Sequence, residues 1–207
     1  MKENKKIEGN LLPLFSSPVY ISKLNRVFSK KELKFFNSSL KKENNTGNKG
    51  SKEKNILNNI NLINLKKDIL NHVYHYCNEI LLTENIKPYI SLSWLNWTKE
   101  NEYHHIHSHQ NSFLSGVFYI NAKKNIDSIT FFKREYEIFN YKRKDYNFFN
   151  SISWKLLVET YNIVIFPSNL IHEVEIKKEN NERCSLAFNI FIKGTLGSKE
   201  TSTFLKL

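Results

Sequence analysis

Histidines are concentrated in one short stretch of the chain. Four of the seven, His104, His105, His107 and His109, lie within residues 102–111, which read EYHHIHSHQN. Successive side chains of an extended strand point to opposite faces, so His105, His107 and His109 are expected to share one face. Neighbouring imidazoles can hold a single ion, and imidazole suits Zn, Fe, Ni and Cu alike. The cluster therefore predicts a metal site, with a solvated histidine-rich loop as the alternative.

A further histidine stands far downstream, among apolar runs. His172 follows the run YNIVIFPSNLI and begins HEVEIK, and after ten intervening residues Arg183 and Ser185 begin the run RCSLAFNIFI. An arginine and a serine two positions apart on a strand share a face. The order H-x-H, a distant H and then R-x-S favours a built metal site over an adventitious metal binder.

Helical patterns fill much of the N-terminal part. Residues 11–24 are expected to be extended, because their two prolines disfavour helix. Ser29 and Glu32 form the pattern of a capping box, which predicts a helix that ends near residue 43. Residues 43–54 are polar and are expected to form a mobile loop. Apolar residues then recur at helical spacing over 56–83, which predicts one long helix or two in succession.

Short β-rich runs take over after Pro88. Each is bounded by polar or turn residues, and they read ISLSWLNWT, FLSGVFYIN, SITFFK, SWKLLVE, YNIVIFP, HEVEIK and RCSLAFNIFIK. Helices followed by strands, without βαβ alternation, predict an α+β chain that is mostly β, with a closed or sandwiched β-domain. No repeat or linker divides the chain, so residues 1–207 are expected to form one domain.

Composition narrows the class of protein. Apolar residues make up 40% of the 207, including 15 Phe, 10 Tyr and 3 Trp, which predicts an ordered core. No apolar run approaches a membrane span, and the basic N-terminus lacks the apolar segment of a signal peptide. We therefore expect a cytoplasmic protein with no membrane partner. The 2 cysteines fit reduced thiols in that compartment.

The net charge of +11 has two interpretations. Excess positive charge favours polyanions such as nucleic acid. Here the charge is spread along the chain, and Lys, Asn and Ile are abundant throughout, as a genome biased toward A and T produces. We therefore do not expect nucleic acid to be the main partner.

Three segments in order carry a family resemblance. HSHQNSFLSGVFYIN, IVIFPSNLIHEVE and RCSLAFNIF resemble the 2OG-Fe(II) oxygenases of bacterial and phage genomes, over about residues 90–193. The resemblance implies a double-stranded β-helix (jelly-roll) core at 89–193, helices at 1–88 packed on it, and a tail at 194–207. It also implies Fe(II) as cofactor and 2-oxoglutarate as cosubstrate, with hydroxylation of a substrate and release of succinate and CO2.

The same resemblance assigns the metal ligands. The wider superfamily holds iron with H-x-D/E and a distal H. Aligned on its strand, this sequence places His107 and His109 at the H-x-D positions and His172 at the distal one. A histidine thus stands where a carboxylate is usual, which makes the site more positive by one charge. Two other arrangements stay open, His105 with His107, or a carboxylate such as Glu102.

Four further residues are implied to contact the cosubstrate. Arg183 would pair with the distal carboxylate of 2-oxoglutarate, because guanidinium presents a planar fork to carboxylates, and Ser185 would add a hydroxyl. Tyr119 and Asn96 would also face the cosubstrate, with a core tyrosine and a sheet-bound amide as the alternatives. The alternative for Arg183 is a surface ion pair with Glu179 or Glu182. Asn189 has the same two interpretations as Asn96, facing the site or satisfied within the sheet. Three aromatic residues are expected in the core: Phe113, Phe118 and Phe188.

The substrate stays open between a small molecule and a peptide, and a homodimer is an open alternative to a monomer. A basic and aromatic segment, residues 133–153, is expected near the mouth of the site, where it recognises an acidic or aromatic partner or simply covers the site. Two other functions remain. One is a three-histidine, cupin-like dioxygenase or isomerase without 2-oxoglutarate, which leaves Arg183 and Ser185 without a role. The other is a non-catalytic jelly-roll protein that binds a polyanion.

Overall fold

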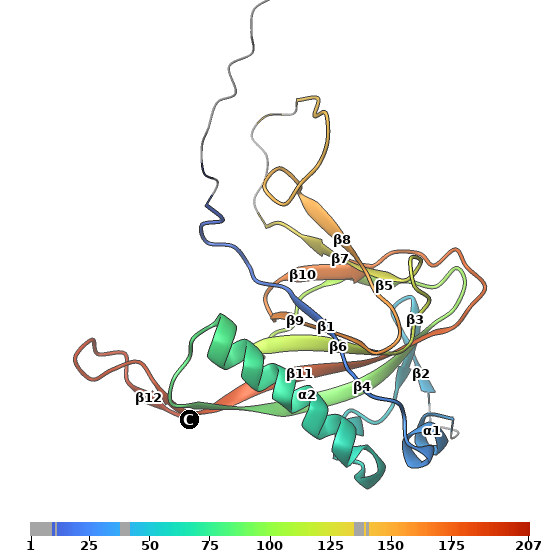
Figure 1. Ribbon diagram of the computed structural model, residues 1–207, viewed down its shortest axis with the longest axis horizontal. Helices are drawn as coiled ribbons and strands as arrows, with labels where there is room; N and C mark the ends of the chain where they lie inside the picture. The colour runs from blue at the N-terminus through green and yellow to red at the C-terminus, as the bar shows by residue number, and fades with distance from the viewer. Residues whose placement is uncertain (1–9, 11, 38–41, 135–138, 140) are drawn as a thin grey trace, which may run out of the picture.

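Two antiparallel β-sheets face each other in the computed structural model (Figure 1), which describes residues 10, 12–37, 42–134, 139 and 141–207. The strands of the described chain are β1 (Tyr20–Lys23), β2 (Lys42–Asn45), β3 (Asn48–Ser51), β4 (Ile86–Thr98), β5 (His104–His107), β6 (Leu114–Asn121), β7 (Ser128–Phe132), β8 (Ser153–Leu157), β9 (Asn162–Pro167), β10 (Ile171–Val174), β11 (Arg183–Leu196) and β12 (Leu205–Lys206). The larger sheet has the order β1-β9-β6-β11-β4-β3-β2, with β12 paired to β11, and the smaller has the order β5-β10-β7-β8. From β4 to β11 the chain passes back and forth between the sheets, which is the winding of a double-stranded β-helix. The expected fold class, α+β and mostly β, is confirmed.

The N-terminal part extends the larger sheet. β1 pairs with β9, as expected for an extended segment. The expected mobile loop at 43–54 is wrong, because β2 and β3 form a hairpin that pairs with β4. Gly47 makes its turn possible, with a φ of +86° that L side chains rarely adopt. The sequence prediction failed here because polar residues usually indicate an exposed loop, whereas three of the four residues of β3 are buried.

Helices cover the outer face of the larger sheet. α1 (Lys30–Phe36) begins with the expected capping box of Ser29 and Glu32, but it ends at Phe36, short of the predicted residue 43. The predicted helix over 56–83 is present in pieces: η1 (Ile56–Asn58), η2 (Ile60–Leu62), α2 (Ile63–His75) and the π-helical turn η3 (Tyr76–Ile80). Within the described residues, no helix is both long and apolar enough to cross a membrane.

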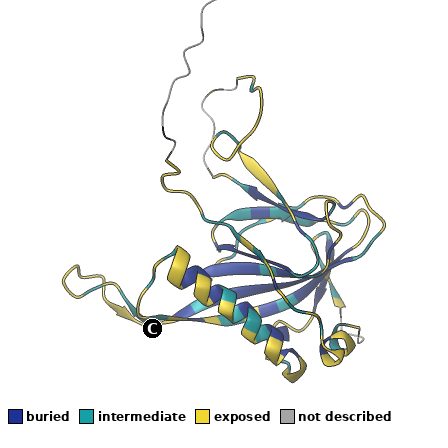
Figure 2. Ribbon diagram, viewed as in Figure 1, coloured by how far each residue is buried: buried dark blue, intermediate teal, exposed yellow. Residues whose placement is uncertain are grey.

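The strands of the larger sheet alternate cleanly between two environments. The apolar stripe of α2 packs against one face, and in β11 that face is formed by Leu186, Phe188 and Ile190, all fully buried. The intervening residues of β11 point toward the smaller sheet. Figure 2 shows the consequence, with the strands between α2 and the smaller sheet buried and β8 exposed. Of the phenylalanines expected in the core, Phe118 and Phe188 are fully buried and Phe113 packs partly buried against the same cluster.

Candidate active site

One cavity between the two sheets gathers every side chain that the sequence singled out as a site residue. They come from both sheets and are Asn96, His107, His109, Tyr119, His172, Arg183 and Ser185. The lining also includes residues that the sequence did not single out, among them Trp94, His104 and Glu173. The cavity therefore has a histidine end, formed by the smaller sheet and the turn after β5, and an arginine end, formed by the larger sheet.

At the histidine end, three imidazoles converge from two strands and a turn. His107 and His172 are direct cross-strand partners of β5 and β10, with ring centroids 4.3 Å apart. His109 lies just beyond β5, where its backbone N–H donates to the carbonyl of Ser168 at 2.8 Å. Its ring centroid lies 5.0 Å from that of His107 and 5.2 Å from that of His172, and its ring stacks on Trp94. One ring nitrogen from each histidine lies within 4.8 Å of the others, which is a grouping that could hold one metal ion.

Two of these rings are oriented by backbone carbonyls. The Nδ1 atom of His107 is 2.7 Å from the carbonyl oxygen of His105, and the Nδ1 atom of His172 is 3.0 Å from that of Leu170. A carbonyl accepts only, so Nδ1 must donate in both rings, and the Nε2 lone pair stays free. A ring nitrogen that donates to a carbonyl while the other faces a metal is the usual arrangement of a histidine ligand.

Burial keeps these imidazoles neutral. Desolvation lowers the pKa of His172 to about 3 and that of His109 to about 4. The pKa of His107 is also lowered, first by burial, against the opposing effect of its bond to the His105 carbonyl. Neutral imidazole is the form that binds metal, so the group is ready to ligate at neutral pH.

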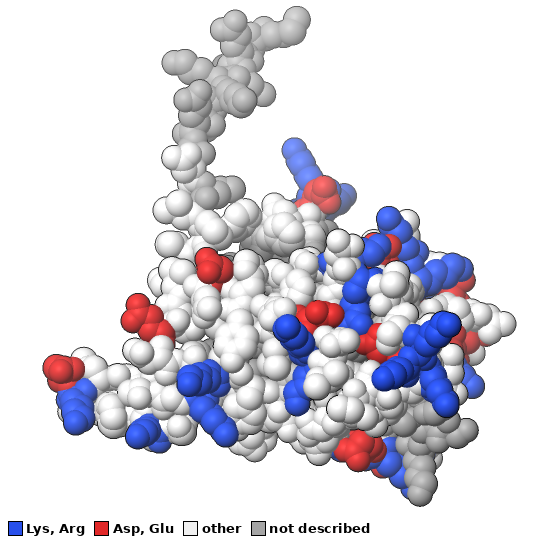
Figure 3. Space-filling model, turned by 60° about the horizontal axis from the view of Figure 1, so that its bottom comes forward, with Lys and Arg blue, Asp and Glu red and all other residues white. Residues whose placement is uncertain are grey.

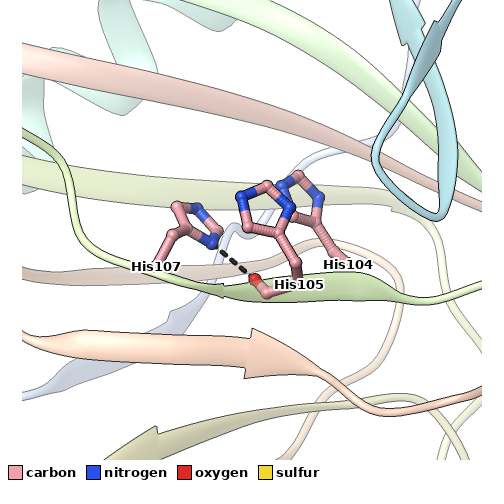
Figure 4. A group of neighbouring side chains, drawn as sticks. All are labelled: His104, His105 and His107. Atoms are coloured by element: carbon pink, nitrogen blue, oxygen red, sulfur yellow. Dashed lines mark hydrogen bonds between the residues drawn. The ribbon is translucent and has the colours of Figure 1, made fainter.

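A second group of histidines, His104, His105 and His107, lies along the same strand (Figure 4). The sequence predicted that His105, His107 and His109 share one face. In the structure His107 and His109 line the cavity, but His104 does so in place of His105. The reason is a shift in the pairing of β5 with β10. Glu102 takes no part, because its carboxylate accepts a bond of 2.8 Å from the backbone N–H of Lys99 in an exposed turn.

At the arginine end, Arg183 is buried with only 3% of its surface exposed. Its Nη1 donates to the carbonyl of Ser128 at 3.0 Å and its Nη2 to Oγ1 of Thr98 at 3.3 Å, while its buried Nε has no partner among the described residues. The alternative of a surface ion pair is wrong. Glu182 lies near two lysines instead, and Glu179 lies near Lys123.

A row of polar side chains leads away from Arg183 across three strands. Ser185 of β11 is paired with Asn96 of β4 on one side and with Tyr119 of β6 on the other. Burial raises the pKa of Tyr119 to about 12, so its hydroxyl keeps its proton. The Oδ1 atom of Asn96 is buried without a partner in the described part of the chain. Asn189, two rows further along, accepts from the hydroxyl of Ser115 at 3.1 Å. A hydrogen bond with its side chain also opposes the lowering of the pKa of His109, so Asn189 meets both the sheet and the site.

The jelly-roll winding and a cavity with imidazoles at one end and a guanidinium at the other place this chain in the class of metal-dependent β-helix enzymes. Its family follows from the sequence of the same region. Residues 92–189, which include all the site residues named above, match the model of the family described as Putative 2OG-Fe(II) oxygenase. The match covers 98 of the 207 residues and supports an oxygenase that depends on Fe(II) and 2-oxoglutarate. No curated protein matches its sequence.

Solved structures with similar folds extend over most of the chain. A 2OG-Fe(II) oxygenase family oxidoreductase from Burkholderia pseudomallei is 13% identical, with a TM-score of 0.58 and 83% of each chain covered. HygX from Streptomyces hygroscopicus, solved with nickel and 2-oxoglutarate, is 9% identical, with a TM-score of 0.60 over 84% of this chain and 82% of its own. A prolyl-4-hydroxylase from Pseudomonas putida is 12% identical, with a TM-score of 0.52 over 84% of this chain and 93% of its own. At these identities the likeness is one of fold.

Proposed function

We propose that this chain hydroxylates an organic substrate, with His107, His109 and His172 as the ligands of Fe(II) and Arg183 as the anchor of 2-oxoglutarate. The observation that carries the proposal is the charge of Arg183. It is a buried cation with no acidic partner among the described ion pairs, and it lines the same cavity as three neutral imidazoles, of which His172 is buried and the other two are half-buried. A buried charge is costly unless an opposite charge meets it, so the cavity calls for an anion.

The histidine end fits the metal. It offers three neutral nitrogen ligands, two of them held in the ligating tautomer by backbone carbonyls. Imidazole is a suitable ligand for ferrous iron. Three neutral ligands leave the full double charge of the ion uncompensated, which is one charge more than a site with two histidines and a carboxylate leaves. An anionic cosubstrate therefore stabilises a three-histidine iron site more than it stabilises a site with a carboxylate ligand.

The arginine end fits the cosubstrate. Arg183 would bind the distal carboxylate through its unpaired Nε and its fork of Nη donors. Ser185 and the protonated hydroxyl of Tyr119 can add neutral donors, since both line the cavity on the same face as Arg183. Asn96 completes the row and brings a polar atom that lacks a protein partner.

When bound together, Fe(II) and 2-oxoglutarate supply the oxidation, in which 2-oxoglutarate, O2 and a C–H group give succinate, CO2 and an alcohol. The protein's own part is to hold and shield the reactants. Arg183 and the histidines set the two ends of the cosubstrate, and the fully buried Phe166, which contacts the His172 ring, helps to exclude water.

A three-histidine enzyme without 2-oxoglutarate remains the second candidate, and the histidine end favours it as much as the first. The arginine end distinguishes them. A reaction without a dicarboxylate leaves a buried guanidinium with no anion to meet it, and leaves the row from Ser185 to Tyr119 without a ligand.

We further propose that the substrate contacts the connection between β7 and β8. This connection includes the basic and aromatic segment 133–153, of which residues 135–138 and 140 lie outside the described part. Arg134 donates to the carbonyl of Asn169 at 2.6 Å, which ties the root of the segment to the turn just before His172. Several aromatic side chains of the segment are exposed: Phe139, Tyr141, Tyr146, Phe148 and Phe149. HygX has been solved with hygromycin B bound, so this fold can admit a substrate of that size.

The charged surface and the thiols bear on the partners and the location of the protein. On the face shown in Figure 3, Lys and Arg are interspersed with Asp and Glu rather than gathered in one tract, which supports a small molecule or peptide over nucleic acid. Cys77 and Cys184 are buried free thiols, which supports a reducing compartment such as the cytoplasm. The pairing of β1 with β9 and of β3 with β4 supports one domain over residues 1–207.

The deciding experiment is an anaerobic titration of metal-free protein with Fe(II) and then with 2-oxoglutarate. We expect a saturable visible charge-transfer band from the chelated 2-oxo acid, weakened in Arg183→Ala. Lys193→Ala is the matched control, because Lys193 is an exposed cation on the same strand. Iron binding without the band would overturn the role of 2-oxoglutarate and favour the three-histidine enzyme. Failure to bind iron would leave the non-catalytic binding protein.

A further inference from the structure

The strand that carries the histidines contains a β-bulge. His107 is paired with His172, and His104 is paired with Val174. Three steps along β5 therefore match two steps along β10, with an irregularity in the register between the pairs. A bulge of this kind adds one residue to a strand and turns the following side chain to the other face. Without it, His104 and His107 would point to opposite faces.

The bulge brings His104 into the cavity beside the metal end. Its ring stacks on that of His107, with centroids 4.7 Å apart and an angle of 21° between the planes, and Figure 4 shows both rings rising from the same side of β5. His104 lines the cavity that holds Arg183. His105 also lies close to His107, but it is not part of the lining.

A chain of buried polar groups connects His104 with Arg183. The amide Nδ2 of Asn48 lies 3.3 Å from Nδ1 of His104 and 3.3 Å from Oγ1 of Thr98. Nη2 of Arg183 donates to the same Thr98 oxygen at 3.3 Å. Asn48 comes from the β2–β3 hairpin and is 4% exposed. Asn48 and Thr98 thus link His104, beside the metal end, to Arg183 at the other end of the cavity.

This chain sets the tautomer of His104. In the observed orientation of the Asn48 amide its nitrogen faces His104 and can only donate, so Nδ1 of His104 accepts and the ring proton sits on Nε2. Within the described residues, no protein acceptor bonds to that Nε2. His104 therefore differs from His107 and His172, whose Nδ1 atoms donate and whose Nε2 lone pairs are free. It presents a neutral N–H donor to the cavity, where they present metal ligands.

We infer that His104 binds the distal carboxylate of 2-oxoglutarate by donating from Nε2, beside Arg183. The inference rests on the proposed function and adds a residue to it. His104 stacks on a proposed iron ligand on one side and shares hydrogen-bonded neighbours with Arg183 on the other. A five-carbon dicarboxylate that chelates iron and reaches Arg183 must pass along it. The hairpin β2–β3 then has a role in the site, because its Asn48 orients the donor.

The test compares two 2-oxo acids in two variants. His104→Phe keeps a flat ring for stacking and removes both nitrogens, and Ile106→Phe, at an exposed position of the same strand, is the matched control. Dissociation constants of 2-oxoglutarate and of pyruvate, which lacks the distal carboxylate, are measured anaerobically on the Fe(II)-loaded protein by the visible band or by calorimetry. We expect His104→Phe to weaken 2-oxoglutarate binding about 10-fold, as loss of a hydrogen bond to a charged group does, and to leave pyruvate binding unchanged.

A second variant guards against misfolding. His104→Gln keeps an amide donor and is expected to bind 2-oxoglutarate within about 3-fold of the wild type. The inference is overturned if His104→Phe binds 2-oxoglutarate as the wild type does, or if it weakens both acids equally, which would indicate a general effect on the site. If the wild type itself shows no 2-oxoglutarate binding, the proposed function falls and the inference with it. Loss in Arg183→Ala but not in His104→Phe overturns the inference alone.

Discussion

The two ends of the cavity are suited to groups of opposite charge. The histidine end gathers neutral imidazoles that can accept a cation, and burial lowers the pKa of each so that it stays unprotonated at neutral pH. The arginine end buries a cation that keeps its charge at any working pH and that forms no ion pair among the described residues. One end is therefore sensitive to acid and the other is not. A ligand bound to both must be an anion with a metal-chelating group.

The ends also differ in what holds them in place. The histidines sit on β5, β10 and the turn after β5, in the smaller sheet. Arg183 sits at the start of β11 in the larger sheet, and its Nη1 bond to the carbonyl of Ser128 reaches across to β7 of the smaller one. The site thus exists only where the two sheets pack together, and each end can be broken without the other.

The largest effect on one end of the cavity alone is expected from His172→Ala. The variant loses the ligand that comes from β10, so we expect Fe(II) or Co(II) affinity to fall by about 100-fold or more, above the roughly 10–100-fold that loss of an outer partner of a ligand costs. Calorimetric titration of the metal-free protein measures this. His75→Ala, an exposed histidine on α2, is the control and should bind metal normally. Unchanged metal affinity in His172→Ala would remove the histidine end from the proposal.

Acid is expected to act on the histidine end next. The pKa of His172 is about 3 in the folded chain, against 6.5 for an ordinary histidine. Between these values the unfolded state binds the proton and the folded state does not, so stability falls as the pH drops below about 6.5 and continues to fall toward the folded pKa. For one such group the loss between pH 7 and pH 5 is about 2 kcal/mol. Urea unfolding of metal-free wild type and His172→Gln at both pH values checks it.

The variant supplies the internal control for that measurement. Carboxylates titrate in both proteins and cancel in the comparison, so His172→Gln should lose less stability than the wild type over the same pH interval. Equal losses would mean that His172 is protonated as easily in the folded chain as in the unfolded one. Bound metal should suppress the acid effect in the wild type, because it competes with the proton for the ring.

Much of this arrangement could be predicted from the sequence, because it depends on period-two alternation. Arg183 and Ser185 share a face of β11, and the strand pattern predicted that β11 lies in the β-domain. The distal position of His172 followed from its place at the start of a short run after a turn. The helical spacing of Leu65, Ile69 and Val73 likewise predicted which face of α2 is buried.

The rest depends on events that leave no local pattern. The β-bulge in β5 turns His104 into the cavity, and nothing in the letters HHIHSH marks where a strand gains a residue relative to its partner. The residues of β3 are polar or glycine, and three of the four are buried because β4 lies beside them. Both features are set by pairing with distant strands, and both act on the same residue, His104.

The smallest effect is expected from a variant that changes the shape of the cation at the arginine end but keeps its charge. Arg183→Lys keeps a cation but removes the planar fork, so it cannot meet a carboxylate with two parallel hydrogen bonds or hold the bonds to Ser128 and Thr98 together. We expect 2-oxoglutarate affinity to fall about 10-fold, with Fe(II) affinity unchanged. Lys193→Arg, the reverse exchange at the exposed end of the same strand, should change neither. If Arg183→Lys instead lowers Fe(II) affinity in step with 2-oxoglutarate affinity, the two ends are not independent, because the guanidinium would then be supporting the histidines and not only binding the acid.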